Sequence, residues 1–164
     1  MVEYYAGIGS RKTPYFILQQ MKSLATYLED SGYILRSGGA DGADKAFESG
    51  VIKGNKEIFY ARDVPSDSPA LELASKIHPA WDRCSPYVRK LMARNCWQVL
   101  GRDLKTPVRG VICWTPGGQM IGGTAQALRL AQMHDISIFN LGAGEQSQSV
   151  RDWFVNTSVL DKGG

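Results

Sequence analysis

The sequence predicts a three-layer α/β domain with a mostly parallel sheet, and three observations lead to this class. Apolar runs of strand length alternate along the chain with segments whose apolar residues recur at helical spacing. The strand candidates show little period-two alternation, which is typical of parallel strands covered by helices on both faces. Several of them run straight into glycine-rich loops that precede a helix. Together these features favour a Rossmann-like domain, in which ligands bind outside the carboxyl ends of the strands.

Length and composition fit one globular domain. Of the 164 residues, 43% are hydrophobic and 21% are charged, which are ordinary values for such a domain. We therefore expect a single domain over residues 1–164. The net charge of +3 is mild. It suits a phosphorylated small molecule better than a duplex, because duplex-binding surfaces carry a concentrated basic stripe.

The sequence indicates no metal, cofactor or membrane. Cys84, Cys96 and Cys113 are odd in number and lie far apart, so we interpret them as reduced thiols, with Cys113 in the core. No apolar run approaches the roughly 20 residues that span a bilayer, and the N-terminus lacks a signal-peptide pattern. We therefore expect a cytoplasmic protein.

The first part of the chain holds three expected strands and two expected helices. Thr13 and Pro14 predict a helix start, because a capping hydroxyl precedes a proline at the first helical position. Gly32 suits the end of that helix. The third strand is expected close to the middle of the sheet. The strands are placed at 2–8, 33–36 and 56–60, and the helices at 14–30 and 43–48.

The second part begins with an irregular segment from Ala61 to Trp81, and connections of this length are often binding loops or lids. Ser85 and Pro86 predict the start of a long helix, and Gly101 its end. Beyond them we expect helices at 69–77, 125–133 and 145–154, strands at 109–114 and 137–141, and a frayed end at 161–164.

The stretch from Trp114 to Gln126 is the one around which the sequence is organised. A strand breaks into two Gly-Gly pairs, and a helix starts after Thr124. Glycines let a ligand approach the backbone closely, and the free N–H groups of a helix start favour an anion such as phosphate. An ordinary turn capped by Thr124 is the alternative. Two Gly-Gly pairs exceed what a cap needs, so we predict a phosphate loop of Thr115, Pro116, Gly117, Gly118, Gly122, Gly123 and Thr124.

A second glycine loop follows the first strand. It contains Gly9, Ser10 and Arg11. A hydroxyl and a guanidinium beside a glycine turn can bind phosphate oxygens, and an arginine can do so through two parallel hydrogen bonds. The alternative is a surface arginine after an ordinary turn. We predict that all three residues contact the ligand.

A third glycine loop follows the second strand and contains Ser37, Gly38 and Gly39, which we also assign to the ligand. Asp41 is expected to accept hydrogen bonds from ribose hydroxyls or from an exocyclic amine of a base. The alternative is that Asp41 caps the following helix and that Asp44 stabilises its first turn. For Asp44 we adopt that structural interpretation.

Two residues in and after the irregular segment are further candidates. Trp81 lies between a proline and a charged turn, where it could stack on a bound base or simply pack. Arg94 and its neighbour Asn95 lie off the apolar stripe of their helix, so exposure to solvent is a strong rival to ligand contact. We include Trp81 and Arg94 in the predicted site.

These loops resemble the SLOG superfamily, which unites the Smf/DprA Rossmann core with the LOG-type (lonely guy) nucleotide hydrolases. The resemblance runs from Val2 to about Leu141 and is closest to the short, stand-alone SLOG proteins of bacteriophages. It is carried by the segments 9–11, 37–44, 78–81, 94–95, 113–118 and 122–124.

The resemblance implies that a nucleotide or nucleotide-derived ligand binds at the glycine loops. LOG enzymes cleave the N-glycosidic bond with a Pro-Gly-Gly-x-Gly-Thr-x-x-Glu motif. Its glutamate falls here on Ala127, and an insertion separates the two glycine pairs. The resemblance therefore implies binding without LOG-type cleavage. It also implies a homo-oligomer, and the host cytoplasm as the location if the chain is phage-encoded.

Three functions follow in order of preference. The first is a sensor, or a phage-encoded sequestering protein, for a nucleotide-derived signal of host defence, with ADP-ribose-derived and cyclic signals as the candidates. The second is an N-glycosidase or phosphoribohydrolase in which Glu48 or Asp41 replaces the missing glutamate. The third is single-stranded nucleic-acid binding of the DprA kind, with bases stacked on aromatic residues and phosphates held by arginines. That surface would consist of Trp81, Arg83, Arg89 and Arg94.

Overall fold

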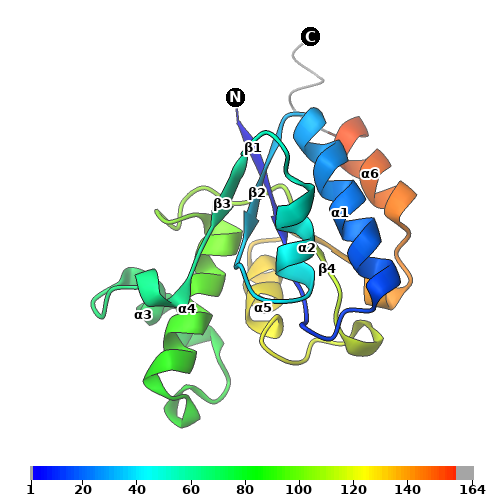
Figure 1. The fold of residues 1–164 in the computed structure, drawn as a ribbon. Coiled ribbons are helices and arrows are strands. Elements are labelled where there is room, and N and C mark those ends of the chain that lie inside the picture. The colour runs from blue at the N-terminus through cyan, green and yellow to red at the C-terminus, as the bar shows by residue number, and fades with distance from the viewer. Residues whose placement is uncertain (1, 158–164) are drawn as a thin grey trace.

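A five-stranded parallel sheet forms the centre of the computed structural model, which describes residues 2–157 (Figure 1). Every neighbouring pair of strands in this sheet is parallel. The predicted α/β class is therefore confirmed. In the spatial order β3-β2-β1-β4-β5, the strands are β3 (Lys56–Ile58), β2 (Tyr33–Ser37), β1 (Glu3–Gly7), β4 (Gly110–Cys113) and β5 (Ser137–Asn140).

Helices cover both faces of the sheet, which confirms the three layers (Figure 1). Strand side chains alternate between two buried clusters, as the pleat of a strand requires. Tyr5 and Ile112 belong to one cluster, and Ala6 and Val111 to the other. The first face carries α1 (Tyr15–Asp30), α2 (Ala43–Gly50) and α6 (Ser147–Asn156), and the second carries α3 (Pro69–Ile77), α4 (Pro86–Leu100) and α5 (Ala125–Met133).

The order of the strands brings three loops to one edge. The direction in which strands are added reverses at β1, so that β2 and β4 flank it. Ligands of open α/β sheets bind outside the carboxyl ends of the strands at such a reversal. Two backbone hydrogen bonds join the loops here. Ser10 N–H donates to the Trp114 carbonyl at 3.2 Å, and Ala43 N–H donates to the Ser10 carbonyl at 3.4 Å.

The third strand is placed differently from our prediction, because β3 lies at an edge of the sheet. The reversal at β1 gives the central position to β1 itself. Lys56 and Glu57 on β3 are exposed or half-buried, in keeping with an edge strand. The predicted position near the middle was therefore wrong.

Helix boundaries agree with the sequence prediction in most places. The helices at 69–77 and 125–133 are confirmed, and Ser85 Oγ caps α4 by accepting from Val88 N–H at 3.2 Å. Helix α1 begins at Tyr15 without a side-chain cap, and the Thr13 hydroxyl donates to the Ser10 carbonyl at 2.6 Å instead. Helix α6 begins later than expected, at Ser147. Residues 161–164 lie outside the described residues.

The irregular segment and the first half of α4 project beyond the carboxyl edge of the sheet (Figure 1). We call residues 69–92 the helical arm. It contains α3, the short 3-10 helix η2 (Trp81–Arg83) and the start of α4, against which α3 packs. Ala61 to Trp81 is thus largely ordered into helical turns, including η1 (Ala61–Asp63). The arm forms one side of the site described below.

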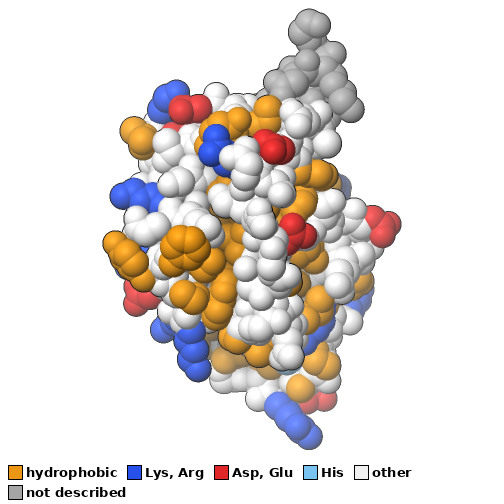
Figure 2. Space-filling view, turned by 90° about the vertical axis from the view of Figure 1, so that its right-hand side faces the viewer, with side chains coloured by type: hydrophobic (Ala, Val, Ile, Leu, Met, Phe, Trp, Pro, Cys, Tyr) orange, Lys and Arg blue, Asp and Glu red, His pale blue; other side chains and the backbone are white. Residues whose placement is uncertain are grey.

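The face of the molecule that carries α1 and α6 has hydrophobic side chains gathered near its middle (Figure 2). At the start of α1, Tyr15 and Phe16 are largely exposed.

Within residues 2–157, none of the helices combines the length and the apolar character needed to cross a membrane.

Candidate functional site

A cavity of about 750 Å³ opens at the carboxyl edge of the sheet, between the three glycine loops and α4. This volume lies within the range of pockets that hold small ligands. The predicted meeting of the loops is therefore confirmed. Ten of the predicted site residues line the cavity: Gly9, Ser10, Arg11, Gly38, Gly39, Arg94, Pro116, Gly122, Gly123 and Thr124.

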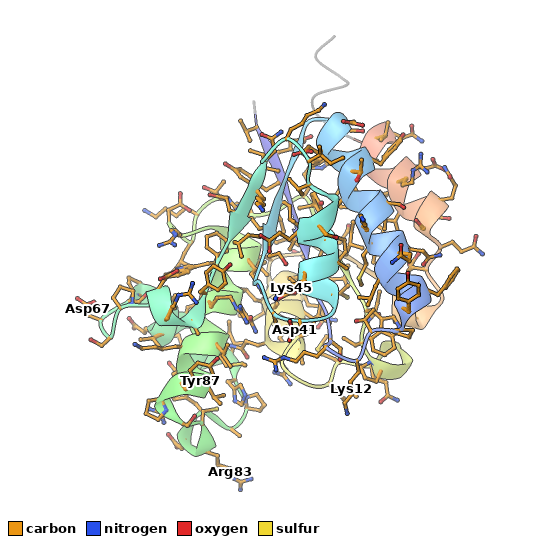
Figure 3. The ribbon with its side chains drawn as sticks, viewed as in Figure 1. Lys12, Asp41, Lys45, Asp67, Arg83 and Tyr87 are labelled. Carbon is orange, nitrogen blue, oxygen red and sulfur yellow. The ribbon has the colours of Figure 1, made fainter. Side chains whose placement is uncertain are left out.

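Two predicted residues of the third glycine loop do not line the cavity. The buried Ser37 hydroxyl donates to the Gly7 carbonyl at 2.6 Å, so it ties β2 to β1. Asp41 is exposed and pairs with Lys45 at 3.2 Å, one helical turn away (Figure 3). Neither side chain is placed to contact a ligand in this cavity.

The central loop divides into a structural part and a part that faces the cavity. Asn140 fixes the first part, because its Nδ2 donates to Thr115 Oγ1 at 2.7 Å and its Oδ1 accepts from Thr115 N–H at 3.2 Å. Gly117 and Gly118 then form η3 (Pro116–Gly118), which packs against η4 (Leu141–Ala143). Thr115, Gly117 and Gly118 are outside the cavity lining, whereas the second Gly-Gly pair is part of it.

Trp81 lies on the helical arm, where it packs instead of covering the cavity. The Arg89 guanidinium lies 5.0 Å from the centre of the Trp81 ring, and its Nη2 donates to the Trp81 carbonyl at 3.1 Å. Two tyrosines that the sequence did not single out are the aromatic residues of the lining. Tyr60 follows β3, and Tyr87 is in the first turn of α4, 63% exposed.

Arg94 and Asn95 are buried, which rules out the rival interpretation of a pair exposed to solvent. Arg94 Nη1 donates to the Gly38 carbonyl at 2.9 Å and to the Phe59 carbonyl at 3.1 Å. Its Nε donates to Asn95 Oδ1 at 3.1 Å, and Asn95 Nδ2 donates to the Gly123 carbonyl at 2.9 Å. The pair therefore joins α4 to two of the three glycine loops.

Asp44 is a cavity residue that sequence reasoning assigned only to the first turn of its helix. It is 4% exposed and lines the cavity, and its Oδ2 accepts from Ala40 N–H at 3.3 Å. Burial raises the pKa of this carboxyl to about 6, while the charge of Arg94 and the N–H groups of Ala40 and Gly9 act in the opposite direction. The sequence did point to this residue, because Asp44 is the last residue of the glycine-loop motif at 37–44.

The polar groups around Gly38 are packed so closely that this position admits no side chain. A Cβ there would lie 2.6 Å from both Asp44 Oδ2 and Gln98 Nε2, and in contact with Arg94 Nη1. All four residues line the cavity. One end of the cavity is thus a set of buried polar groups that includes a carboxylate.

The other end of the cavity is open and suited to an anion. Thr124 makes no capping hydrogen bond, and no acidic residue lies in the first turn of α5. A Cβ built on Gly122 or Gly123 would meet nothing within 4 Å. The exposed Arg11 and Lys12 belong to the same lining. This arrangement favours an anion at the start of α5, whereas Asp44 already occupies the start of α2.

The residues considered for N-glycosidic cleavage lie elsewhere. Ala127, the position of the LOG-type glutamate, is fully buried in the core. Glu48 pairs with Lys56 at 2.9 Å and, like Asp41, does not line the cavity. Of the lining residues that the structure describes, Asp44 alone carries a carboxylate. Among residues 2–157, no group of three or more His, Cys, Asp or Glu side chains is arranged to hold a metal ion.

Comparison with known proteins adds a likeness of fold. The chain is similar to a solved structure of DNA processing protein A from Helicobacter pylori, with a TM-score of 0.63 and 20% sequence identity. The match covers 97% of this chain and 81% of that chain. The Helicobacter structure was described for the way in which that protein binds single-stranded DNA. No protein-family model and no curated protein matches the sequence. The two chains share the Rossmann-like fold.

The buried carboxylate gives a first prediction, on stability. Because the pKa of Asp44 is raised from 3.8 to about 6 in the folded chain, its contribution is least favourable above pH 6 and improves as the pH falls towards 4. Asp44→Asn should therefore raise the free energy of unfolding at pH 7.5 by up to about 3 kcal/mol, at 1.36 kcal/mol per pKa unit. Near pH 4 the two proteins should be equally stable.

Urea denaturation at both pH values measures this difference. Asp41→Asn is the matched control, because it removes an exposed carboxylate from the same loop. A difference in free energy of unfolding between wild type and Asp44→Asn that is the same at both pH values would contradict a raised pKa of Asp44.

Proposed function

We propose that this chain binds a nucleotide or nucleotide-derived small molecule in the cavity at the carboxyl edge of the sheet. The observation that carries the proposal is the open start of α5 within a cavity of about 750 Å³. The N–H groups of a helix start, with the helix dipole behind them, offer a site for phosphate.

The remaining lining suits the other parts of a nucleotide. Arg11 and Lys12 also line the cavity, and their charged groups can bind phosphate oxygens. Tyr60 and Tyr87 offer aromatic surface for a base, and the Arg62 guanidinium covers the Tyr60 ring at 4.2 Å from its centre. A phosphate, a pentose and a base thus each have matching groups.

We further propose the SLOG superfamily as the family of the chain, and a sensor or sequestering protein of host-defence signalling as its role. The shared fold with DNA processing protein A and the glycine-loop motifs support the first of these. The position of the LOG-type glutamate is occupied here by the buried Ala127, and the missing carboxylate supports binding over cleavage. Association into a homo-oligomer stays a prediction, which light scattering of the purified chain measures.

Gly123 offers a test that leaves the fold intact. Its φ lies outside the left-handed region, and a side chain there would meet nothing within 4 Å. Gly123→Asp places a negative charge at the start of α5 and should reduce affinity for nucleoside monophosphates by about tenfold or more, because it repels phosphate. Gly123→Asn, of the same size and uncharged, should keep most of the affinity.

Isothermal titration calorimetry measures both variants, and circular dichroism checks their folding. The ligand is recovered afterwards by heat denaturation and analysed, since free base or ribose phosphate would indicate the hydrolase alternative, with Asp44 as the acid. Equal affinity in Gly123→Asp and Gly123→Asn would remove the start of α5 from the site.

Single-stranded DNA binding is the second candidate. It is supported by the shared fold with a protein for which this binding has been described, and by the exposed Tyr87 where the helical arm meets the cavity. Arg83 lies further out, at the tip of the arm (Figure 3). A strand running from the cavity along the arm would pass from Tyr87 to Arg83.

This candidate predicts that Arg83→Ala weakens binding of a thymidine oligonucleotide and makes its affinity less dependent on salt, because one phosphate contact is lost. Fluorescence anisotropy at several salt concentrations measures both effects. Lys53→Ala is the control, because Lys53 is an exposed lysine paired with Asp30. Equal binding by wild type and Arg83→Ala, or an affinity independent of salt, would contradict a DNA path along the arm.

A further inference from the structure

A second cavity, of about 490 Å³, lies between the segment that leads into the helical arm and the loop that follows α4. None of its lining residues lines the cavity between the glycine loops. Asp67 is at the outer end of that segment, on a different side of the molecule from Lys12 (Figure 3). We call this cavity the acidic groove, and its lining includes Asp63, Pro65, Asp67, Pro69, Trp97 and Asp103.

The acidic groove is negatively charged, although the chain as a whole carries +3. Three aspartates line it, and Arg102 is the one basic residue of the lining that the structure describes. Asp63 and Asp67 are exposed, and their carboxylates make no hydrogen bond or ion pair within residues 2–157. Two donors of its own loop fix the carboxylate of Asp103, at 2.9 and 2.8 Å. The groove therefore offers two free carboxylates, and a third in a fixed position, to a cation.

Arg102 does not neutralise these carboxylates. Its guanidinium lies 4.7 Å from the centre of the Trp97 ring and 5.6 Å from that of the Phe59 ring, and it makes no ion pair with a described residue. Cations are attracted to the faces of aromatic rings in this way. The aromatic part of the groove is thus already covered by a guanidinium, while its aspartates are left for a cation from outside.

Trp97 brings a hydrogen-bond donor to the groove. The residue is only 4% exposed, and its indole N–H makes no hydrogen bond within residues 2–157. This N–H group is not sealed from solvent either. An indole N–H usually has a partner when its ring is buried. The donor of Trp97 is therefore suited to an acceptor supplied by a ligand in the groove.

We propose that the acidic groove binds a basic, extended peptide segment of a partner protein. Lysine or arginine side chains of that segment pair with Asp63 and Asp67, and one of its backbone carbonyls accepts the indole N–H of Trp97. The exposed Pro65 and Pro69 give apolar surface to the aliphatic stems of those side chains. This site goes beyond the proposed nucleotide binding, with which it shares no lining residue.

Other ligand classes match the groove less well. A nucleic acid or a phosphate is repelled by the aspartates. Within residues 2–157, no group of three or more His, Cys, Asp or Glu side chains is arranged to hold a metal ion. A polyamine satisfies the carboxylates but has no carbonyl for the indole N–H of Trp97. A peptide supplies both the cations and the acceptor.

The test titrates the nitrogen-15-labelled chain with a lysine octapeptide and with an arginine octapeptide, and follows the indole N–H signals of its four tryptophans. Trp97→Phe identifies the Trp97 signal. We expect this signal to shift saturably with at least one peptide, and the affinity to fall as salt is added, because exposed charges are screened. Spermine, a polycation without a carbonyl, should leave the Trp97 signal nearly unmoved.

A double variant assigns the contact to the groove. Asp63→Asn with Asp67→Asn should weaken peptide binding about fivefold or more, since two exposed ion pairs are lost. Asp41→Asn with Asp152→Asn is the matched control, because it removes two exposed carboxylates elsewhere and changes the net charge equally. Its affinity should stay within about twofold of wild type.

Three results would overturn the proposal: no saturable shift of the Trp97 signal with either peptide, an equal shift with spermine, or equal affinity in the two double variants. Nucleoside monophosphate binding, measured on the same samples, should not differ between wild type and Asp63→Asn with Asp67→Asn. The acidic groove and the nucleotide cavity are therefore tested independently.

Discussion

The buried guanidinium of Arg94 holds the candidate site together. It donates to the carbonyls of Gly38 and Phe59, and through Asn95 it reaches the carbonyl of Gly123. Carbonyls at loop ends inside a protein need donors, and an arginine can supply several in fixed geometry. One helix thereby sets the spacing of two glycine loops that come from strands on either side of β1. The charge of Arg94 also favours ionised Asp44 against the effect of burial.

The three similar glycine loops have different roles. The loop after β2 encloses its own carboxylate, and the first Gly-Gly pair of the central loop packs against η4, where a Cβ on Gly118 would lie 2.6 Å from Ala143 Cβ. The start of α5 is left without an internal anion or cap. The proposed nucleotide binding depends on this open helix start.

The sequence was sufficient for the fold class and for the meeting of the glycine loops at one cavity. Apolar strands ending in glycine loops predicted a parallel sheet and a ligand edge, and most helix bounds followed from caps such as Ser85. What the sequence could not supply was the direction of side chains within a motif. Asp41 and Asp44 are three residues apart, yet one is exposed and the other is buried in the cavity. For Arg94 the sequence left exposure to solvent as a rival interpretation, because helical periodicity does not show a polar contact made with a distant loop.

The measurement that bears on the phosphate end of the cavity is a titration of the labelled chain with a nucleoside monophosphate, followed by amide chemical shifts. We expect saturable shifts at Gly122, Gly123 and Thr124, whose N–H groups lie at the open start of α5. The same titration with the unphosphorylated nucleoside should leave these amides nearly unmoved. Shifts confined to η2 (Trp81–Arg83) on the arm, or no saturable shift at residues 122–124, would contradict phosphate binding at this helix start.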